Sequence, residues 1–263
     1  MTRVAVSVAE YEGAGPFLAS GLRSGDRYEL SDGHAFYCAP RGADVARAIL
    51  VGAQVLGTDP AVTEAGIDAG YSFGPRHLRA PDIAIGNVPD RPGWIAGAPS
   101  LAVEYAGSGQ DEEKLQEKIA DLLGAGTRWL WVVRLLGPRR VEIHEADRPI
   151  RTLGPGEALL APGALKNPVL VEELYDRAAS DRATLRNLLQ REGYESLAQV
   201  RDEAREEGRA EGRALSVLKV LTKRGIEVPS DVQARILACR DLALLDGWLE
   251  RAIEAKSLAD VMG

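Results

Sequence analysis

The topology of the first 175 residues rests on four segments: PDIAIG at 81–86, SLAVEYA at 100–106, DEEKLQEKIADLL at 111–123 and WLWVV at 129–133. The first, second and fourth are short apolar runs near Gly, Pro or Ser, a pattern typical of buried β-strands. The third places its apolar residues at i, i+4, i+7 and i+8, which predicts an amphipathic helix. The glycine-rich GAG that follows provides the C-cap of this helix.

The flanking segments extend the same pattern. RYELSDGHAFYCAP at 27–40 predicts a hairpin, because Asp32-Gly33 favours a tight turn between two β-prone segments. ADVARAILVGAQVLG at 43–57 predicts a buried helix. AVTEAGI at 61–67 and VEIHEA at 141–146 predict two further strands. The order of these elements, a helix, then strands, then a helix and a strand, indicates an α/β or α+β domain around one mixed sheet.

The character of the chain changes near residue 175. Residues 1–175 carry 17 Lys/Arg and 23 Asp/Glu, whereas residues 176–263 carry 15 and 16 and consist largely of helix formers. EEGRAEGR at 206–213 places two glycines four residues apart on one helix face. Pro229 separates this helix from further amphipathic segments. We therefore expect a domain over 1–175 and a helical tail over 176–263, which is typical of an oligomerisation or docking module.

The composition is that of a folded protein with a modest acidic excess. Of 263 residues, 45% are hydrophobic and 27% are charged, and the formal net charge is −7. The apolar content excludes a disordered chain, and the acidic balance argues against tight non-specific binding of nucleic acid. No run approaches the roughly 18 apolar residues of a membrane span, and the N-terminus lacks the apolar stretch of a signal peptide. We expect a cytoplasmic protein with no membrane partner.

Cysteine and histidine do not have the spacing of a redox or metal centre. Cys38 and Cys239 lie far apart and form neither a disulfide framework nor a metal knuckle. His34, His77 and His144 match no zinc motif. Any chemistry is therefore expected from carboxylates and lysines.

Two carboxylates occupy matching positions on two predicted strands. Because side chains alternate between the faces of a strand, Asp82 lies on the face opposite to two isoleucines, and Glu104 lies between Ala102 and Ala106. A buried carboxylate is costly unless it is paired or binds a metal, and Mg²⁺ and Mn²⁺ prefer such oxygen ligands. If the strands are neighbours, Asp82 and Glu104 form a metal site. The alternative is that each acid faces water on an open face of the sheet.

Lys118 flanks the apolar stripe of the 111–123 helix. From this position its ammonium group can extend along the sheet toward the two acids, where it would stabilise developing negative charge or orient a water molecule. Lys114, one turn earlier, lies further into the polar face of the helix. The alternative for Lys118 is a side chain whose stem packs on the helix while its charge stays in water.

The order and spacing of several segments resemble the Uma-two family of restriction-endonuclease-like proteins, a branch of the PD-(D/E)XK nuclease superfamily. These segments are SVAEYEGA at 7–14, RYELSDGHAFYCAP at 27–40, APD at 80–82 and VEYAGSGQDEEKLQEKIADLLGAGTRWLWVV at 103–133. The resemblance covers about residues 5–175. It implies a restriction-endonuclease-like α/β fold, with a mixed central sheet flanked by helices and, in this chain, an α-helical C-terminal extension.

The tail has a resemblance of its own. EGRAEGR at 207–213 and LLDGWLERAIEAKSLADVM at 244–262 are similar to the C-terminal segments of transposase-associated nucleases. This similarity is less specific than that of residues 5–175.

By position, the resemblance to the Uma-two family implies catalytic roles for Asp82, Glu104, Lys118 and Glu29. Asp82 matches the aspartate of the PD element and Glu104 the following acid, and the two would bind the metal together with the Tyr105 carbonyl. The usual lysine two residues after the acid is absent, and the family supplies it from the next helix, at Lys118. Glu29 matches an acidic position that completes the metal shell.

The activity implied by the resemblance is hydrolysis of DNA phosphodiester bonds by an endonuclease that depends on Mg²⁺ or Mn²⁺. The metal would polarise the phosphate and activate water, and Lys118 would position or deprotonate that water. Because two strands need two active sites, such enzymes usually dimerise. DNA and a second copy of the chain are the partners that we expect.

Other functions stay open. Leu122 stands where the family has a tyrosine, and Lys114 stands where it has an acid. The histidine that the family often has in its early helix has no counterpart around residues 43–50. The alternative is therefore a catalytically impaired domain that acts as a binding or assembly module through its tail. A hydrolase of a small phosphorylated substrate is less well supported, because no phosphate-binding loop is present. A phosphate-contacting patch, or else a set of solvated side chains, is expected from five arginines: Arg76, Arg79, Arg128, Arg139 and Arg140.

Overall fold

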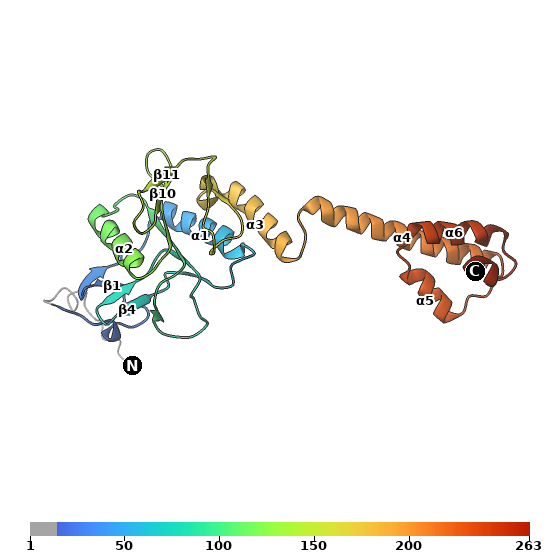
Figure 1. Ribbon diagram of the computed structural model, residues 1–263, viewed down its shortest axis with the longest axis horizontal. Coiled ribbons are helices and arrows are strands. Elements are labelled where there is room, and N and C mark those ends of the chain that lie inside the picture. The colour runs from blue at the N-terminus through green and yellow to red at the C-terminus, as the bar shows by residue number, and fades with distance from the viewer. Residues whose placement is uncertain (1–14) are drawn as a thin grey trace. The chain divides into compact units, whose positions relative to one another are not determined.

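The computed structural model describes residues 15–263, so the SVAEYEGA segment at 7–14 lies outside the described residues. The chain divides into two compact units, Met1–Glu192 and Gly193–Gly263. Each unit has a hydrophobic core of its own, and Figure 1 shows sheets and helices in the first unit and helices alone in the second.

A mixed sheet of six strands forms the centre of the first unit, in the order β11-β10-β9-β8-β6-β3. Its strands are β3 (Ala65–Ile67), β6 (Ile83–Ile85), β8 (Leu101–Ala106), β9 (Trp129–Arg134), β10 (Arg140–His144) and β11 (Arg151–Leu153). β8 and β9 are parallel, and the other neighbouring pairs are antiparallel. A parallel pair needs a crossover connection, which α2 (Glu112–Gly124) supplies.

Helices cover both faces of this sheet. α1 (Ala43–Thr58) packs on the face that carries Val103 and Tyr105. The leucine-rich stripe of α2 packs on the opposite face, against Ala102 and Ala106, and Figure 1 shows the two helices on either side of the strands. The predicted alternation along 100–106 is therefore confirmed.

A second sheet, in the order β2-β1-β5-β4-β7, borders the first. Its strands are β1 (Tyr28–Ser31), β2 (His34–Tyr37), β4 (Tyr71–Gly74), β5 (His77–Arg79) and β7 (Ile95–Ala96). β1 and β2 form the predicted hairpin, in which Asp32 and Gly33 have φ angles of 43° and 81°, as a two-residue type I′ turn requires. The expectation of a single sheet was wrong, because β4, β5 and β7 are short segments without a clear apolar alternation.

The boundary between the units lies after Glu192 rather than near residue 175. α3 (Arg177–Arg191) belongs to the first unit because its polar side chains bind the backbone of α1. Ser180 Oγ donates to the Val51 carbonyl and Asn187 Nδ2 to the Val55 carbonyl, each at 3.0 Å. The sequence placed the boundary too early because α3 resembles the tail in composition. The remaining short elements of this unit are η2 (Ala19–Gly21), β12 (Ala158–Leu159), β13 (Val169–Leu170) and η3 (Val171–Leu174).

The second unit is entirely helical. It consists of α4 (Leu197–Lys223), α5 (Ser230–Ala238), α6 (Leu242–Glu254) and α7 (Ala259–Met262). Val217 and Leu221 of α4 pack with Trp248 of α6 in its core, whereas the first turns of α4 are largely exposed. Across residues 15–263, none of the helices combines the length and the apolar character needed to cross a membrane.

The close approach of a tyrosine requires Gly52 in the middle of α1. A Cβ atom at this position would collide with the hydroxyl of Tyr105, which donates a hydrogen bond to the Leu174 carbonyl at 3.0 Å. We predict that Gly52→Ala lowers the free energy of unfolding by about 1–3 kcal/mol, the usual cost of overpacking a core. Chemical denaturation followed by circular dichroism measures this change.

Gly208→Ala is the matched control. Gly208 also lies inside a helix, but open space surrounds its Cβ position. Alanine there removes the entropic cost of glycine, so the stability of the second unit should rise by about 0.5–1 kcal/mol. An unchanged stability of Gly52→Ala would contradict the close approach of α1 and β8.

Candidate active site

Asp82 and Glu104 meet on the face of the central sheet that points away from α1. β6 pairs with β8 so that Ile83 lies opposite Val103, and the same register continued by one residue places Asp82 beside Glu104. Both acids are almost fully buried, at 1% and 3% exposure. The backbone N–H of Tyr105 donates to Asp82 Oδ2 at 2.7 Å and thereby orients this carboxylate.

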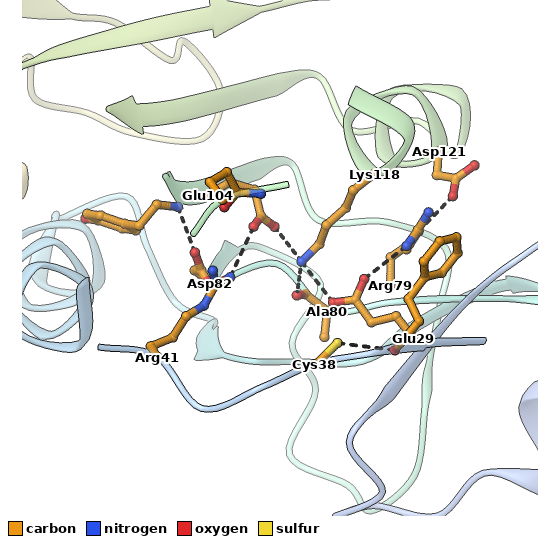
Figure 2. A network of polar contacts seen from close by, with 12 residues as sticks. Glu29, Cys38, Arg41, Arg79, Ala80, Asp82, Glu104, Lys118 and Asp121 are labelled. Atoms are coloured by element: carbon orange, nitrogen blue, oxygen red, sulfur yellow. Dashed lines mark hydrogen bonds and ion pairs between the residues drawn. The ribbon is translucent and has the colours of Figure 1, made fainter. Parts of the chain in front are cut away.

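Lys118 reaches this pair from α2 (Figure 2). Its Nζ lies 2.9 Å from Glu104 Oε1 and 2.9 Å from Glu29 Oε1, and it donates to the Ala80 carbonyl at 2.6 Å. The contact with Glu104 is an ion pair at short distance, although its angles do not meet hydrogen-bond geometry. Lys118 is buried, so the alternative of a lysine that keeps its charge in water is excluded.

Glu29 on β1 links the site to a second cluster of charges. Arg79 Nη1 lies 3.3 Å from Glu29 Oε2, and its Nε donates to Asp121 Oδ2 at 2.7 Å. Ser31 Oγ donates to the same Asp121 oxygen at 2.7 Å. The structure therefore joins Glu29, Asp82, Glu104 and Lys118 in one network (Figure 2), as their assignment to one site requires.

Three groups near the site were not predicted. Arg41 Nη2 lies 2.7 Å from Asp82 Oδ1 and 3.9 Å from Glu104 Oε2. Asp68 is exposed, and desolvation of its carboxyl together with the nearby Asp82 carboxylate raises its pKa. Neither residue stands in an apolar pattern or at a recognisable spacing, so no signal in the sequence marks them.

Cys38 is the third of these groups. Its side chain lies beside Glu29 in Figure 2, although the residue as a whole is exposed. Desolvation of the thiol and the Glu29 carboxylate raise the pKa of Cys38 to about 11. The thiol is therefore neutral at physiological pH and is a poor nucleophile.

Burial dominates the electrostatics of the site. Desolvation raises the pKa of Glu104 from 4.5 to about 8, against the attraction of Lys118 and with the help of Asp82 and Glu29. For Lys118 burial lowers the pKa, but the carboxylates of Glu104, Glu29 and Asp82 together raise it above its ordinary value. Lys118 is therefore permanently positive. The attraction of Lys118 only partly offsets the cost of burying a negative charge on Glu104.

The carboxylates of Asp82 and Glu104 match the donor chemistry of Mg²⁺ or Mn²⁺, which proteins often bind through one or two carboxylates plus water and substrate oxygens. The raised pKa of Glu104 also indicates that the site would accept another cation. A closed protein cage is not present, because residues 15–263 contain no group of three or more His, Cys, Asp or Glu arranged to hold a metal. The ammonium of Lys118 lies 2.9 Å from both Glu29 Oε1 and Glu104 Oε1.

Tyr105 contributes its amide to the site and keeps its side chain elsewhere. Its N–H binds Asp82, and its hydroxyl binds the Leu174 carbonyl in the core behind the sheet. Metal binding through the Tyr105 carbonyl stays a prediction.

The two departures from the family pattern on α2 have structural explanations. Leu122 is fully buried in the apolar layer between α2 and the sheet. Lys114 is exposed and lies 3.4 Å from Asp111, the N-cap of the helix.

The five arginines of the expected phosphate patch contact different protein groups. Arg76 pairs with Asp32 at 2.6 Å, Arg79 is buried in the network of Glu29, and Arg140 pairs with Glu142 at 3.2 Å. Arg128 and Arg139 lie over aromatic rings, those of Trp129 and Tyr175. Most of this set is thus occupied in structural contacts.

Comparison with known proteins supports the fold. No family model matches the chain, and no curated protein sequence matches it. Four chains of solved structures do match. One of them is a crystal structure described as a putative nuclease belonging to DUF820 from Anabaena variabilis, with a TM-score of 0.54 and 16% identity, over 63% of this chain and 99% of that one.

The predicted fold class is thereby confirmed. The chain has a mixed α/β fold with helices on both faces of the sheet and helices at its C-terminal end, and over 63% of its length it is similar in fold to the structure described as a putative nuclease. At 16% identity the likeness is one of fold.

The raised pKa of Glu104 makes stability depend on pH. The folded protein holds a proton on Glu104 that the unfolded chain releases near pH 4.5, so this stabilisation is complete below about 4.5 and is lost as the pH rises through about 8. Without divalent cations, Glu104→Gln should remove this loss and be the more stable protein at pH 8. Urea unfolding at pH 5 and pH 8 measures the difference, with the exposed Glu113→Gln as control. Parallel pH dependence of wild type and Glu104→Gln would contradict the prediction.

Removal of the Lys118 charge should be severely destabilising. Lys118→Met leaves Glu29 and Glu104 buried without their shared cation, and the loss of one partner of a buried pair costs about 3–5 kcal/mol. Lys114→Met, one turn earlier and exposed, should change the free energy of unfolding by less than about 0.5 kcal/mol. The double variant Lys118→Met/Glu104→Gln should recover part of the loss. Equal effects of the two lysine substitutions would refute the buried network.

Proposed function

We propose that this chain is a divalent-metal-dependent DNA endonuclease of the PD-(D/E)XK type. The observation that carries the proposal is the buried pair of Asp82 and Glu104 beside Lys118, whose Nζ lies 2.9 Å from Glu104. The likeness of the fold to a structure described as a putative nuclease supports it. The resemblance of the sequence to the Uma-two family supplies the substrate class, DNA.

Each member of the network has a role in this proposal. Asp82 and Glu104 would hold Mg²⁺ or Mn²⁺, with the Tyr105 carbonyl as a further ligand. A cation bound there supplies Lewis-acid activation of a phosphate oxygen and of water. Glu29 would act through Lys118, since it lies 2.9 Å from the ammonium and keeps it within reach of Glu104.

The role of Lys118 is electrostatic. Because its pKa is raised, it does not accept a proton from water at neutral pH. Its charge instead offsets negative charge that develops on the phosphate, and its position orients a water molecule. Of the two roles implied by the family, positioning is therefore the one we propose.

A catalytically impaired assembly module is the second candidate. Arg41 already neutralises Asp82 at 2.7 Å, and Leu122 fills the place of the family tyrosine. In that case the helical second unit would carry the function. For the active enzyme, the same unit is the proposed contact of a homodimer, and the cytoplasm is the proposed location.

Conservative substitutions at the two acids test the endonuclease. Asp82→Asn and Glu104→Gln keep the volume of the side chains and remove the charge. Metal ions stabilise transition states by several kcal/mol, so each variant should nick supercoiled plasmid at least roughly 100-fold more slowly than wild type in Mg²⁺ or Mn²⁺. Calorimetric titration with Mn²⁺ should show weaker binding by both.

Glu113→Gln, an exposed acid on α2, is the control and should nick and bind Mn²⁺ as wild type does. Metal binding by wild type with no nicking of any DNA form would favour the impaired module. If wild type neither binds the metal ion nor nicks DNA, the proposed endonuclease function is wrong.

A further inference from the structure

Arg41 lies in the loop between β2 and α1, next to Gly42, the N-cap of α1. From this loop its guanidinium reaches across to the two acids on the sheet (Figure 2). Its Nη2 lies 2.7 Å from Asp82 Oδ1 and 3.9 Å from Glu104 Oε2. It is the second cation of the site, on the opposite side of Glu104 from Lys118.

Each of the two acids has one oxygen engaged by the fold and one that faces Arg41. Asp82 Oδ2 accepts from the Tyr105 backbone, and Asp82 Oδ1 accepts from Arg41. Glu104 Oε1 lies against Lys118, and Glu104 Oε2 faces Arg41. The two oxygens on which a metal ion could bind, Asp82 Oδ1 and Glu104 Oε2, are therefore the two that face Arg41.

The two cations differ in how firmly they are held. The side chain of Lys118 is 10% exposed and contacts three acceptors, two carboxylates and the Ala80 carbonyl. The side chain of Arg41 is 40% exposed, and within residues 15–263 its ion pairs are those with Asp82 and Glu104. An arginine anchored at one end in a loop, with much of its side chain in water, can leave this position without opening the core.

We propose that Arg41 is an internal counter-ion that competes with a divalent metal ion for the free oxygens of Asp82 and Glu104. The inference rests on the proposed function, because it assumes that these two acids bind a metal. A guanidinium at contact distance from these oxygens repels a second cation bound to them. Metal binding is therefore favoured when the guanidinium leaves, and the free energy needed to break its ion pairs with Asp82 and Glu104 lowers the apparent metal affinity.

Titration of the full chain with Mn²⁺ tests the competition. Arg41→Met keeps an unbranched side chain without the charge, so Mn²⁺ should bind about tenfold more tightly than to wild type, which is about 1.4 kcal/mol. Arg41→Lys restores a point charge at the same place and should bind within about threefold of wild type. Circular dichroism of each variant verifies that it is folded.

Arg76→Met is the matched control, because it removes the same charge from the same unit but from a pair with Asp32. It should leave the Mn²⁺ affinity unchanged. Tighter binding by Arg41→Met alone supports the proposal, including the case in which wild type shows no measurable binding. If folded Arg41→Met binds Mn²⁺ no more tightly than wild type, or if Arg76→Met gains as much affinity as Arg41→Met, the proposed competition is wrong. The proposed metal site is not contradicted by either result. Absence of Mn²⁺ binding in every variant overturns the competition and the proposed metal site together.

Discussion

Three carboxylates buried beside one another place the strongest constraint on the first unit. Asp82, Glu104 and Glu29 are each less than 10% exposed, and a buried charge costs several kcal/mol unless a cation compensates it. Lys118 compensates Glu104 and Glu29 from α2, and Arg41 compensates Asp82 and the second oxygen of Glu104 from a loop. The strands and α2 must therefore meet within ion-pair distance for the unit to fold, and the half-exposed Arg41 adds a second compensating charge from its loop.

The surrounding structure meets this requirement through small residues and backbone groups. Ala102 and Ala106 keep the sheet surface low on either side of Glu104, so that α2 packs closely and Lys118 reaches the acid. On the other face, Gly52 admits the Tyr105 hydroxyl and lets α1 approach β8. The amide of the same tyrosine orients Asp82. Both faces of one strand thus contribute to the position of the acids.

The negative charge of Glu104 is only partly compensated by its neighbours, and this connects the stability of the fold to the proposed binding of a metal ion. Glu104 keeps a raised pKa although Lys118 is 2.9 Å away. A group whose charged form is unfavourable gains most from an additional cation, and strongly shifted pKa values concentrate at functional sites. In Figure 2 each buried acid lies beside a cation: Asp82 beside Arg41, Glu104 beside Lys118, and Glu29 beside Lys118 and Arg79. Such an arrangement tolerates the exchange of one cation for another better than the loss of one.

Local sequence pattern was sufficient to predict several features of the fold and of the site. The period of two along 100–106 assigned Glu104 to the alanine face, the period of 3.6 along α2 placed Lys118 beside the apolar stripe, and Asp32-Gly33 specified the hairpin that presents Glu29. Short strands such as β4, β5 and β7 were missed, because they have too few residues to show a period. α3 was assigned to the tail, because composition does not report which surface a helix packs on.

Which charges meet depends on how the chain folds in three dimensions. The pairing of β6 with β8, the arrival of Arg41 from a loop and the burial of Arg79 between Glu29 and Asp121 join residues that are distant along the chain. No local pattern encodes such contacts, because an ion pair depends on the distance between two side chains and on the water removed from them. The four candidate residues could be chosen from the sequence, but their partners and their protonation states follow from the fold.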